Sequence, residues 1–319
     1  DAMLSKKLGA QGIGLCRTEH MFFEKKRIRS VQKMILSNSS VDRKGAIMEL
    51  LPYQKRDFYQ ILKEMAPNPV TIRLLDPPLH EFLPSLKNEK LIKNLAKNMQ
   101  ISSKNIKNRI IDLFEINPML GHRGCRLAIS YPEITEMQVE AILSACAKLI
   151  NKGIKPNPEI MIPLVGTIGE FENQRKIIFS IADKLNEKYN IKIKYKVGTM
   201  IELPRACLVA DEIAKKADFF SFGTNDLTQT TFGFSRDDIG SFIQDYFDNN
   251  IIVEDPFKTI DINGVGQLVK LATEKGREAK PKIKIGICGE HGGDPKSIYF
   301  FDDIKLDYVS CSPYRVPIA

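Results

Sequence analysis

The chain has 319 residues, of which 43% are hydrophobic and 27% are charged, and its formal net charge is +8. A single α/β barrel of about 250 residues or more fits within this length. No apolar run approaches the roughly 20 residues of a membrane span, and the first residues lack a signal-peptide core, so we expect a cytoplasmic protein that binds no membrane. The six cysteines form no CxxC pair, which is typical of reduced thiols.

Much of the basic excess lies in identifiable stretches, of which residues 25–29 are one and residues 87–109 are the longer. Residues 87–109 contain seven lysines or arginines and a single acid, Glu89. Apolar residues such as Leu91, Ile92 and Leu95 recur there at helical spacing, and no aromatic residue accompanies them. This pattern favours a solvated helix face over a nucleic-acid-binding surface, so we expect no nucleic-acid partner.

Short apolar runs alternate with helical patterns along the chain. The runs have the length of buried strands, and the segments between them carry apolar residues at helical spacing. Alternating strands and helices form a parallel sheet, and eight such units would close into a (β/α)8 TIM barrel. Seven strands are predicted at residues 12–16, 70–76, 159–164, 197–202, 219–226, 284–289 and 307–311, and helices at residues 53–66, 133–152, 169–189 and 264–276.

An eighth strand is expected at residues 125–130, where a helix is the alternative. A doubly wound open sheet is the competing architecture, but the glycine-rich fingerprint of dinucleotide binding is missing after the first strand. The connections at residues 17–69 and 77–124 are longer than a plain βα loop needs, so we expect long insertions at the barrel mouth or surfaces for subunit contact. No linker divides the chain, which predicts one domain over residues 1–319.

Two carboxylates, Glu202 and Asp226, stand at the ends of consecutive predicted strands. The segment between them begins with Pro204 and has helical apolar spacing, so it is predicted to be the crossover of a βαβ unit. The crossover makes the strands parallel and brings both carboxylates to the same edge, on strands about 4.8 Å apart. Two hard oxygen ligands suit Mg²⁺, with Mn²⁺ as the alternative, better than Zn²⁺. The pair predicts a divalent metal site.

Arginines occur at the ends of the first two strands. Arg17 follows the first strand, and Arg73 lies in the second, three residues before Asp76. A guanidinium group matches phosphate or carboxylate geometry, so Arg17 and Arg73 could clamp an anionic substrate beside the metal. The alternative is a pair of structural salt bridges. Arg123 and Arg236 are weaker candidates, because a lone arginine in a loop is usually a surface residue.

Further candidates lie in two glycine-containing segments. Gly223, Thr224 and Asn225 precede Asp226, and they combine a glycine that lets a ligand approach closely with an amide, although ordinary turns have the same composition. Cys288 ends another strand, where nearby cations and a metal would favour its thiolate and allow proton transfer to or from carbon. The alternative for Cys288 is a small buried packing residue. The sequence contains no GxSxG elbow, Walker A loop or HxxxH pair.

Five segments of the sequence resemble a known family. They are residues 12–23, 71–84, 121–127, 219–229 and 286–294, and they include the strings RTEH and LLDPPLHEF. In these segments the chain resembles the C-terminal barrel of the PEP-utilising enzymes, a family that includes PEP synthase and enzyme I of the sugar phosphotransferase system. The resemblance extends over essentially all 319 residues. Within the family, the sequence of these segments is most similar to the dikinase branch, which converts ATP, phosphate and pyruvate to AMP, pyrophosphate and PEP.

The resemblance implies an Mg²⁺-dependent phosphotransferase barrel that binds PEP or pyruvate. It implies that Glu202 and Asp226 hold the metal and that Cys288 is the proton donor to C3 of PEP. The implied substrate-binding residues are Arg17, Arg73, Arg123, Glu202, Gly223, Thr224, Asn225, Asp226 and Arg236.

The resemblance also implies partners outside this sequence. The ATP-binding domain and the phosphohistidine segment of the family do not appear among the 319 residues. The chain is therefore expected to be a fragment that exchanges a phosphoryl group with the phosphohistidine domain of the full-length enzyme and cannot alone make PEP from ATP. A homodimer through this domain is also expected.

Other functions are compatible with the same residues. PEP synthase and enzyme I share the barrel, and a lyase or aldolase that acts through an Mg²⁺–pyruvate enolate would also use arginine, glutamate and aspartate at strand ends. A non-enzymatic alternative is a dimerisation or docking module that uses the long insertions.

Overall fold

Seven parallel strands form one sheet in the computed structural model, which describes residues 2–24, 26–37 and 39–319. The spatial order of the strands is the same as their order in the chain. Each strand overlaps one of the seven apolar runs that the sequence predicts. The strands are β1 (Ile13–Arg17), β2 (Pro69–Arg73), β3 (Asn157–Ile162), β4 (Lys196–Ile201), β5 (Phe219–Gly223), β6 (Lys284–Cys288) and β7 (Tyr308–Ser310).

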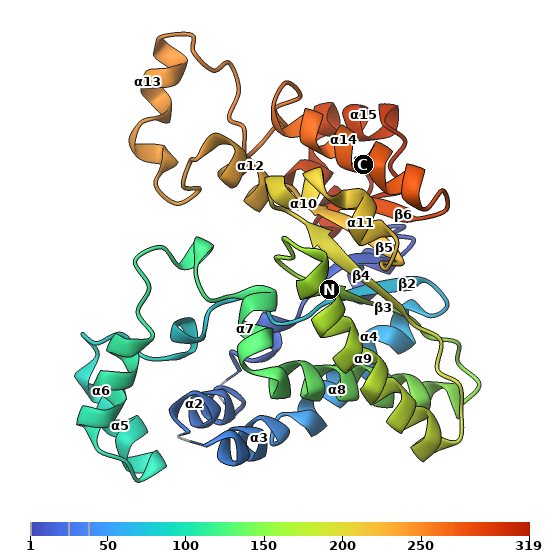
Figure 1. Cartoon of the computed structure of the whole chain (residues 1–319). Helices are drawn as coiled ribbons and strands as arrows, with labels where there is room; N and C mark the ends of the chain where they lie inside the picture. The colour runs from blue at the N-terminus through green and yellow to red at the C-terminus, as the bar shows by residue number, and fades with distance from the viewer. Residues whose placement is uncertain (1, 25, 38) are drawn as a thin grey trace.

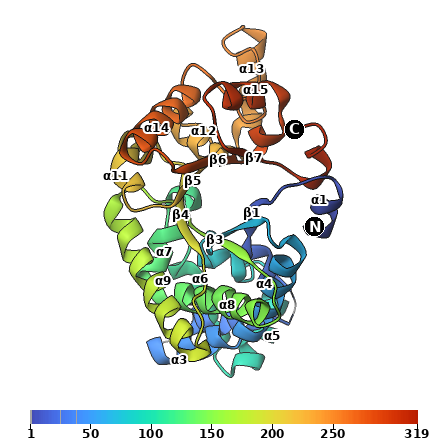
Figure 2. The ribbon, with the colours of Figure 1, turned by 90° about the vertical axis from the view of Figure 1, so that its right-hand side faces the viewer.

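The sheet curves into a nearly closed barrel with its seam between β1 and β7 (Figure 2). A Cβ atom on Gly14 of β1 would lie 2.6 Å from the Cβ of Ser310 in β7, so the two edge strands approach each other closely. Among the described residues no strand pairing joins these two edges. The described part of the chain therefore has seven strands, and the expected count of eight is not confirmed.

The segment predicted as an eighth strand, residues 125–130, belongs to a helix, so the strand assignment is wrong and the alternative is right. Gly124 has a φ of 58° and donates its backbone N–H to the carbonyl of Asp76 at 2.9 Å, which turns the chain into α7 (Gly124–Ser130). The side chains of Cys125 and Leu127 are buried. A short apolar run can pack either as a buried strand or as a buried helix, so its pattern does not decide between them.

Helices cover the outside of the barrel and form its insertions (Figure 1). The four helices predicted from the sequence correspond to α4, α8, α9 and α14, whereas the predicted crossover helix before β5 is divided at Val209 into α10 and α11. The helices are α1 (Ala2–Lys7), α2 (Ile28–Leu36), α3 (Ser40–Met48), α4 (Leu51–Met65), α5 (Glu89–Met99), α6 (Ser103–Asp112), α7, α8 (Pro132–Ile150), α9 (Ile168–Tyr189), α10 (Pro204–Leu208), α11 (Ala210–Ala214), α12 (Thr224–Phe232), α13 (Ile243–Asp248), α14 (Val265–Ala279) and α15 (Pro295–Asp303).

Side chains alternate between the two faces of the sheet. Ile160 and Ile162 of β3 join the main core, which the outer helices cover. Met161, which lies between them, belongs instead to a small separate cluster with Met200 and Cys288. Because successive side chains of a strand point to opposite faces, this cluster lies on the inner face of the barrel. Cys288 is therefore part of the barrel interior.

The long early connections form helical insertions. In Figure 1 the pair α5 and α6, which follows β2, and α13, which follows β5, extend from the barrel on the same side. The basic stretch at residues 87–109 lies in α5 and α6, where Ile92 and Leu95 are buried and Lys93 and Lys97 are exposed, so the predicted solvated helix face is confirmed. No helix in the described ranges is long and apolar enough to cross a membrane.

Candidate active site

A cavity of about 390 Å³ lies at the carboxyl ends of the strands. Its walls come from the segments that follow β1, β2, β5 and β6, together with the turn before α7. The carboxyl end of a parallel barrel is where side chains from separate strands converge, and it is where barrel enzymes bind their substrates. The residues that line the cavity are Arg17, Glu19, His20, Arg73, Met119, Asn225, Asp226, Gln229, Arg236 and Glu290.

Glu202, which directly follows β4, is fully buried. Its Oε1 atom accepts a hydrogen bond of 2.6 Å from the backbone N–H of Leu164, whereas its Oε2 atom has no hydrogen-bond partner among the described residues. Burial, followed by the negative charges of Asp226 and Asp76, raises the pKa of Glu202 to about 8. A buried carboxylate oxygen without a donor is costly, and a cation beside it would stabilise its charge.

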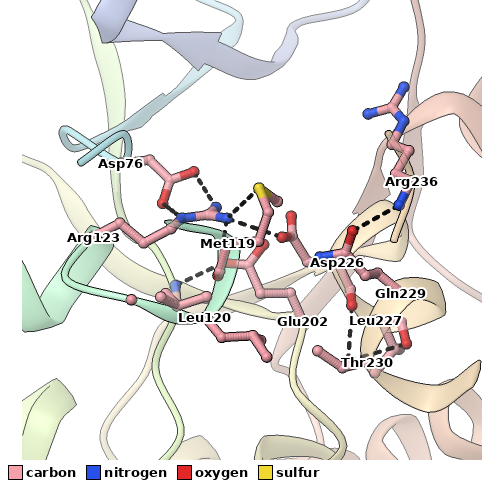
Figure 3. Close-up of polar contacts among 12 residues, drawn as sticks. Asp76, Met119, Leu120, Arg123, Glu202, Asp226, Leu227, Gln229, Thr230 and Arg236 are labelled. Carbon is pink, nitrogen blue, oxygen red and sulfur yellow. Dashed lines mark hydrogen bonds and ion pairs between the residues drawn. The ribbon is translucent and has the colours of Figure 1, made fainter. Parts of the chain in front are cut away.

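Glu202 and Asp226 lie at the same edge of the sheet, as the parallel crossover requires. Their strands, β4 and β5, are parallel neighbours. A Cβ atom on Gly223 would lie 2.4 Å from Glu202 Oε2, so only a glycine lets the carboxylate occupy this position. Figure 3 shows Glu202 and Asp226 beside the guanidinium group of Arg123. The described residues contain no group of three or more potential protein ligands, so a cation here would need water or substrate oxygens as well.

Arg123 connects Asp76 with Asp226 across the site (Figure 3). Its Nη2 lies 2.7 Å from Asp76 Oδ2, its Nε donates to Asp76 Oδ1 at 3.2 Å, and its Nη1 lies 3.2 Å from Asp226 Oδ1. The guanidinium group is almost completely buried. Arg123 therefore supplies a positive charge in a fixed orientation next to the carboxylate pair.

Arg73 and Arg17 have different surroundings. Arg73 is buried, its Nη1 lies 2.8 Å from Asp76 Oδ2, and its Nη2 donates to Glu19 Oε1. Structural salt bridges, which the sequence analysis gave as the alternative to anion binding, are therefore present at Arg73. Arg17 is exposed at the cavity, and its side chain has no hydrogen bond or ion pair within the described ranges. Its guanidinium group is available to an anion in the cavity.

Asp76 and Glu19 are parts of this network that the sequence analysis did not assign. Asp76 accepts from both Arg73 and Arg123. Although burial alone would raise the pKa of Asp76, the charges of these two arginines outweigh burial and lower it. In the sequence, Asp76 could be noticed as an acid three residues after Arg73 at the end of a strand. Its ion pair with Arg123 could not be predicted, because the two residues are far apart in the sequence.

Cys288 ends β6 inside the barrel, with 1% of its surface exposed. The hydroxyl of Ser221 donates a hydrogen bond of 3.3 Å to its sulfur atom. Burial raises the pKa of the thiol to about 11, although Ser221, Arg73 and Arg17 each act to lower it. The two arginines thus favour the thiolate, in the direction that the sequence predicts, but desolvation outweighs their charge here.

The remaining predicted residues surround the start of α12. Thr224 is fully buried, and Asn225 Oδ1 accepts a hydrogen bond of 3.4 Å from the backbone N–H of Glu290. The side chain of Arg236 points away from Asp226 (Figure 3) and lies 3.7 Å from Glu290 Oε1, where both side chains are partly exposed. Arg236 thus belongs to the outer rim of the cavity, whereas Thr224 and Asn225 lie close to the carboxylates.

The nearly closed parallel barrel and its cavity of acids and arginines, with the buried thiol of Cys288 in the barrel interior, define a candidate active site of the barrel-enzyme class. A family model described as PEP-utilising enzyme, PEP-binding domain matches residues 1–319, so the chain belongs to this family, and the resemblance stated from the sequence is confirmed.

Several plant proteins are similar to the whole chain. It is 58% identical to the chloroplastic pyruvate, phosphate dikinase of Flaveria trinervia, 57% identical to pyruvate, phosphate dikinase 1 of Arabidopsis thaliana and 55% identical to pyruvate, phosphate dikinase 2 of Zea mays. The alignments cover 100% of this chain and 34%, 33% and 36% of these relatives, respectively. The chain spans about one third of the length of the curated relatives it matches.

Proposed function

We propose that the chain is the PEP- and pyruvate-binding catalytic part of a pyruvate, phosphate dikinase. In this proposal it transfers a phosphoryl group between a phosphohistidine of another domain and the enolate oxygen of pyruvate. Membership of the PEP-binding family and the names of the relatives support the substrate class. The observation that carries the proposal is the buried Oε2 of Glu202, which has no hydrogen-bond partner among the described residues and lies near Asp226. Asp226 lines the cavity together with Arg17.

Glu202 and Asp226 would hold Mg²⁺, with Mn²⁺ as the alternative. The donor set fits such an ion, because both ligands supply hard carboxylate oxygens, and Glu202 Oε2 is buried with no hydrogen-bond partner in the part of the chain that the structure describes. When bound, a divalent cation would offset negative charge on the carboxylate and enolate oxygens of the substrate. The two carboxylates would in turn set where the substrate oxygens lie relative to Cys288.

The arginines would bind the phosphoryl group in two ways. Arg17 has no partner within the described ranges and would contact the phosphoryl oxygens directly. Arg73 and Arg123 are held by Asp76, so they would contribute positive charge without having to be ordered when the substrate binds. Arg236, at the rim of the cavity, would add positive charge near the incoming phosphoryl group. Such charges stabilise the oxygens that crowd together during an in-line transfer.

Cys288 would move the proton at C3. In the direction of pyruvate formation, its thiol donates a proton to C3, and the Ser221 hydroxyl stabilises the thiolate that remains. A raised pKa suits this direction because the group is protonated before the reaction. In the direction of PEP formation, the thiolate removes a methyl proton from pyruvate. Gly223, Thr224 and Asn225 would shape the pocket between the carboxylates and the thiol.

The partners of this reaction would lie outside the chain. The relatives are about three times as long, which leaves room for an ATP-binding domain and a phosphohistidine domain. We therefore expect the 319-residue chain to bind PEP or pyruvate but to form no PEP from ATP, phosphate and pyruvate. A homodimer through this barrel completes the proposal, and sedimentation of the isolated chain would measure it.

Calorimetry with oxalate, which resembles the pyruvate enolate, tests the proposal directly. Oxalate should bind the wild-type chain with Mg²⁺ and lose most of its affinity in EDTA. Glu202→Gln and Asp226→Asn should each weaken Mg²⁺-dependent binding about tenfold or more. Asp302→Asn, at an exposed position on α15, is the matched control and should bind normally. Equal binding with and without Mg²⁺, or none at all, would refute the proposal.

A further inference from the structure

His291 lies outside the cavity lining but connects three segments around it. It belongs to the 3-10 turn Glu290–Gly293 that follows β6, and its side chain is fully buried. Its Nδ1 atom lies 2.7 Å from the hydroxyl oxygen of Thr224, at the start of α12. Its Nε2 atom lies 2.9 Å from the carbonyl oxygen of Pro256, on the chain that returns from α13. One imidazole ring therefore contacts the segments that follow β5, β6 and α13.

The two partners determine which ring nitrogen carries the hydrogen. The carbonyl oxygen of Pro256 can only accept, so Nε2 must donate. In a neutral imidazole Nδ1 then has a lone pair, and it accepts the hydrogen of the Thr224 hydroxyl. Burial, the largest influence, lowers the pKa of His291, which agrees with a neutral ring.

This arrangement fixes the Thr224 hydroxyl relative to the chain beside Cys288. A Cβ atom on Gly289 would lie 2.6 Å from Thr224 Oγ1, so the hydroxyl packs directly against the backbone of the residue after Cys288. Gly289 has a φ of 140°, which a residue without a side chain adopts at little cost. The backbone N–H of Glu290 also donates to Asn225 Oδ1 at 3.4 Å. The ends of β5 and β6 are thus joined beside the pocket.

We propose that His291, as the Nε2–H tautomer, is a positioning residue that orients the Thr224 hydroxyl and holds the segments after β5 and β6 at a fixed separation. Through Thr224 it sets the distance between Asp226, on one segment, and Cys288, on the other. The proposal rests on the proposed function in so far as this pocket binds oxalate with Mg²⁺.

Two substitutions separate the two contacts of the ring. In His291→Asn the amide oxygen can take the place of Nδ1 and accept from Thr224, whereas the contact to Pro256 is lost. In His291→Gln the amide nitrogen can take the place of Nε2 and donate to Pro256, whereas the contact to Thr224 is lost. We expect His291→Gln to weaken Mg²⁺-dependent oxalate binding about tenfold, and His291→Asn to stay within a factor of about three of wild type.

A double-mutant cycle with Thr224 isolates the hydroxyl contact. Thr224→Val removes the hydroxyl with little change in shape, so combining it with His291→Gln should weaken binding no further than Thr224→Val alone. The single variant Thr224→Ser keeps the hydroxyl, so its Mg²⁺-dependent oxalate binding should be close to the wild-type value. Additive losses in the double variant would overturn the proposal, because they would mean that the two side chains act independently.

Histidine side-chain NMR of the wild-type chain tests the tautomer without any ligand. Long-range ¹H–¹⁵N spectra near neutral pH should show the Nε2–H form for His291. An Nδ1–H form or an imidazolium would overturn the proposal even if both His291 variants failed to fold.

The two proposals fail in different ways. If wild-type chain binds no Mg²⁺–oxalate, the proposed function fails, and the NMR spectrum still decides the tautomer. If wild type binds and His291→Gln binds equally well, only the positioning role of His291 fails.

Discussion

Nε2 of Gln138 donates a hydrogen bond of 2.9 Å to the hydroxyl oxygen of Thr18, although the two residues lie 120 positions apart in the sequence. Thr18 in turn donates to the carbonyl oxygen of Arg73 at 2.9 Å, and Gln138 Oε1 accepts from the backbone N–H of Leu75 at 2.8 Å. Gln138 lies in α8 and is fully buried. A single helix residue therefore joins the end of β1, which bears Arg17, to the end of β2.

Gln138→Leu should destabilise the chain and disturb the arginine pair. The change leaves the Leu75 N–H buried without a partner, and each unsatisfied buried group of this kind costs about 1–3 kcal/mol. We expect the unfolding free energy in urea to fall by about that amount and Mg²⁺-dependent oxalate binding to weaken. Gln267→Leu, at an exposed position of α14, is the matched control. Wild-type stability in Gln138→Leu would show that these hydrogen bonds do not join the strand ends.

Gly223→Ala should displace Glu202 without straining the backbone. The φ of Gly223 is −87°, which alanine adopts readily, but the new Cβ would lie 2.4 Å from Glu202 Oε2 and 2.8 Å from Met200 Cε. Overpacking of this kind costs about 1–3 kcal/mol. We expect Mg²⁺-dependent oxalate binding, measured by calorimetry, to fall sharply.

Gly45→Ala is the control for Gly223→Ala. A Cβ atom on Gly45, in the exposed part of α3, meets nothing within 4 Å. This variant should bind oxalate normally and gain roughly 0.5–1 kcal/mol of stability, because alanine favours a helix over glycine. Undiminished binding in Gly223→Ala would mean that Glu202 can move aside without loss, which would contradict a fixed ligand geometry.

The strands and the edge that carries Glu202 and Asp226 could be predicted from the sequence because both follow from local rules. A short apolar run bounded by turn residues predicts a buried strand, and a helical crossover between two such runs makes them parallel. Strand direction then places Glu202 and Asp226 at one edge. The helix at residues 125–130 was not decided by its pattern, because a short apolar run has no clear period.

The electrostatic surroundings of the candidate site could not be predicted in the same way. The pKa of Cys288 depends on how completely the barrel buries it, and the sequence shows only its charged neighbours. Gln138 and His291 make their contacts with residues from distant segments, so neither has a local pattern that distinguishes it from a surface residue. Burial and long-range pairing decide these features, and both appear only once the chain is folded.

Glu159 and Lys284 form an ion pair that should control acid stability, in which the carboxylate is fully buried and the lysine is partly exposed. Lys284 Nζ lies 2.9 Å from both carboxylate oxygens of Glu159, which also accepts from Thr71 Oγ1 at 2.8 Å and from Lys196 Nζ at 3.2 Å. Burial alone would raise the pKa of Glu159, but the hydrogen bonds and charges of Lys284, Thr71 and Lys196 together lower it. The stabilisation is present above the unfolded-state pKa of about 4.3, and it is lost as the pH falls through the lower folded-state pKa.

Lys284→Met should remove most of this stabilisation near neutral pH. Breaking a fully buried pair costs about 3–5 kcal/mol, and the loss here should be smaller, because Lys284 is partly exposed and Lys196 and Thr71 remain beside Glu159. The variant should therefore unfold at lower urea concentration near pH 7 and lose less additional stability on acidification than wild type. Lys275→Met breaks a more exposed pair with Asp211 and should cost about 1 kcal/mol or less. Equal losses in the two variants would show that burial does not strengthen the Glu159 pair.

Cys288→Ala should abolish the exchange of pyruvate methyl protons with deuterated solvent in the presence of Mg²⁺. Oxalate should still bind to this variant, because oxalate has no methyl group and its binding needs no proton transfer. Loss of a general base slows a step by about 10²–10⁴-fold. Exchange needs the thiolate, and burial raises the pKa of Cys288 to about 11, so the wild-type rate should rise with pH through the neutral and alkaline range.

Ser221→Ala removes the hydroxyl that donates to the Cys288 sulfur. The thiol pKa should rise further, because the thiolate loses a stabilising hydrogen bond, so exchange should be slower at every pH below it. Cys311→Ala, at the partly exposed Cys311, should exchange at the wild-type rate. Persistent exchange in Cys288→Ala, measured by NMR, would remove Cys288 from the proton transfer and favour a barrel that stabilises the enolate with another base.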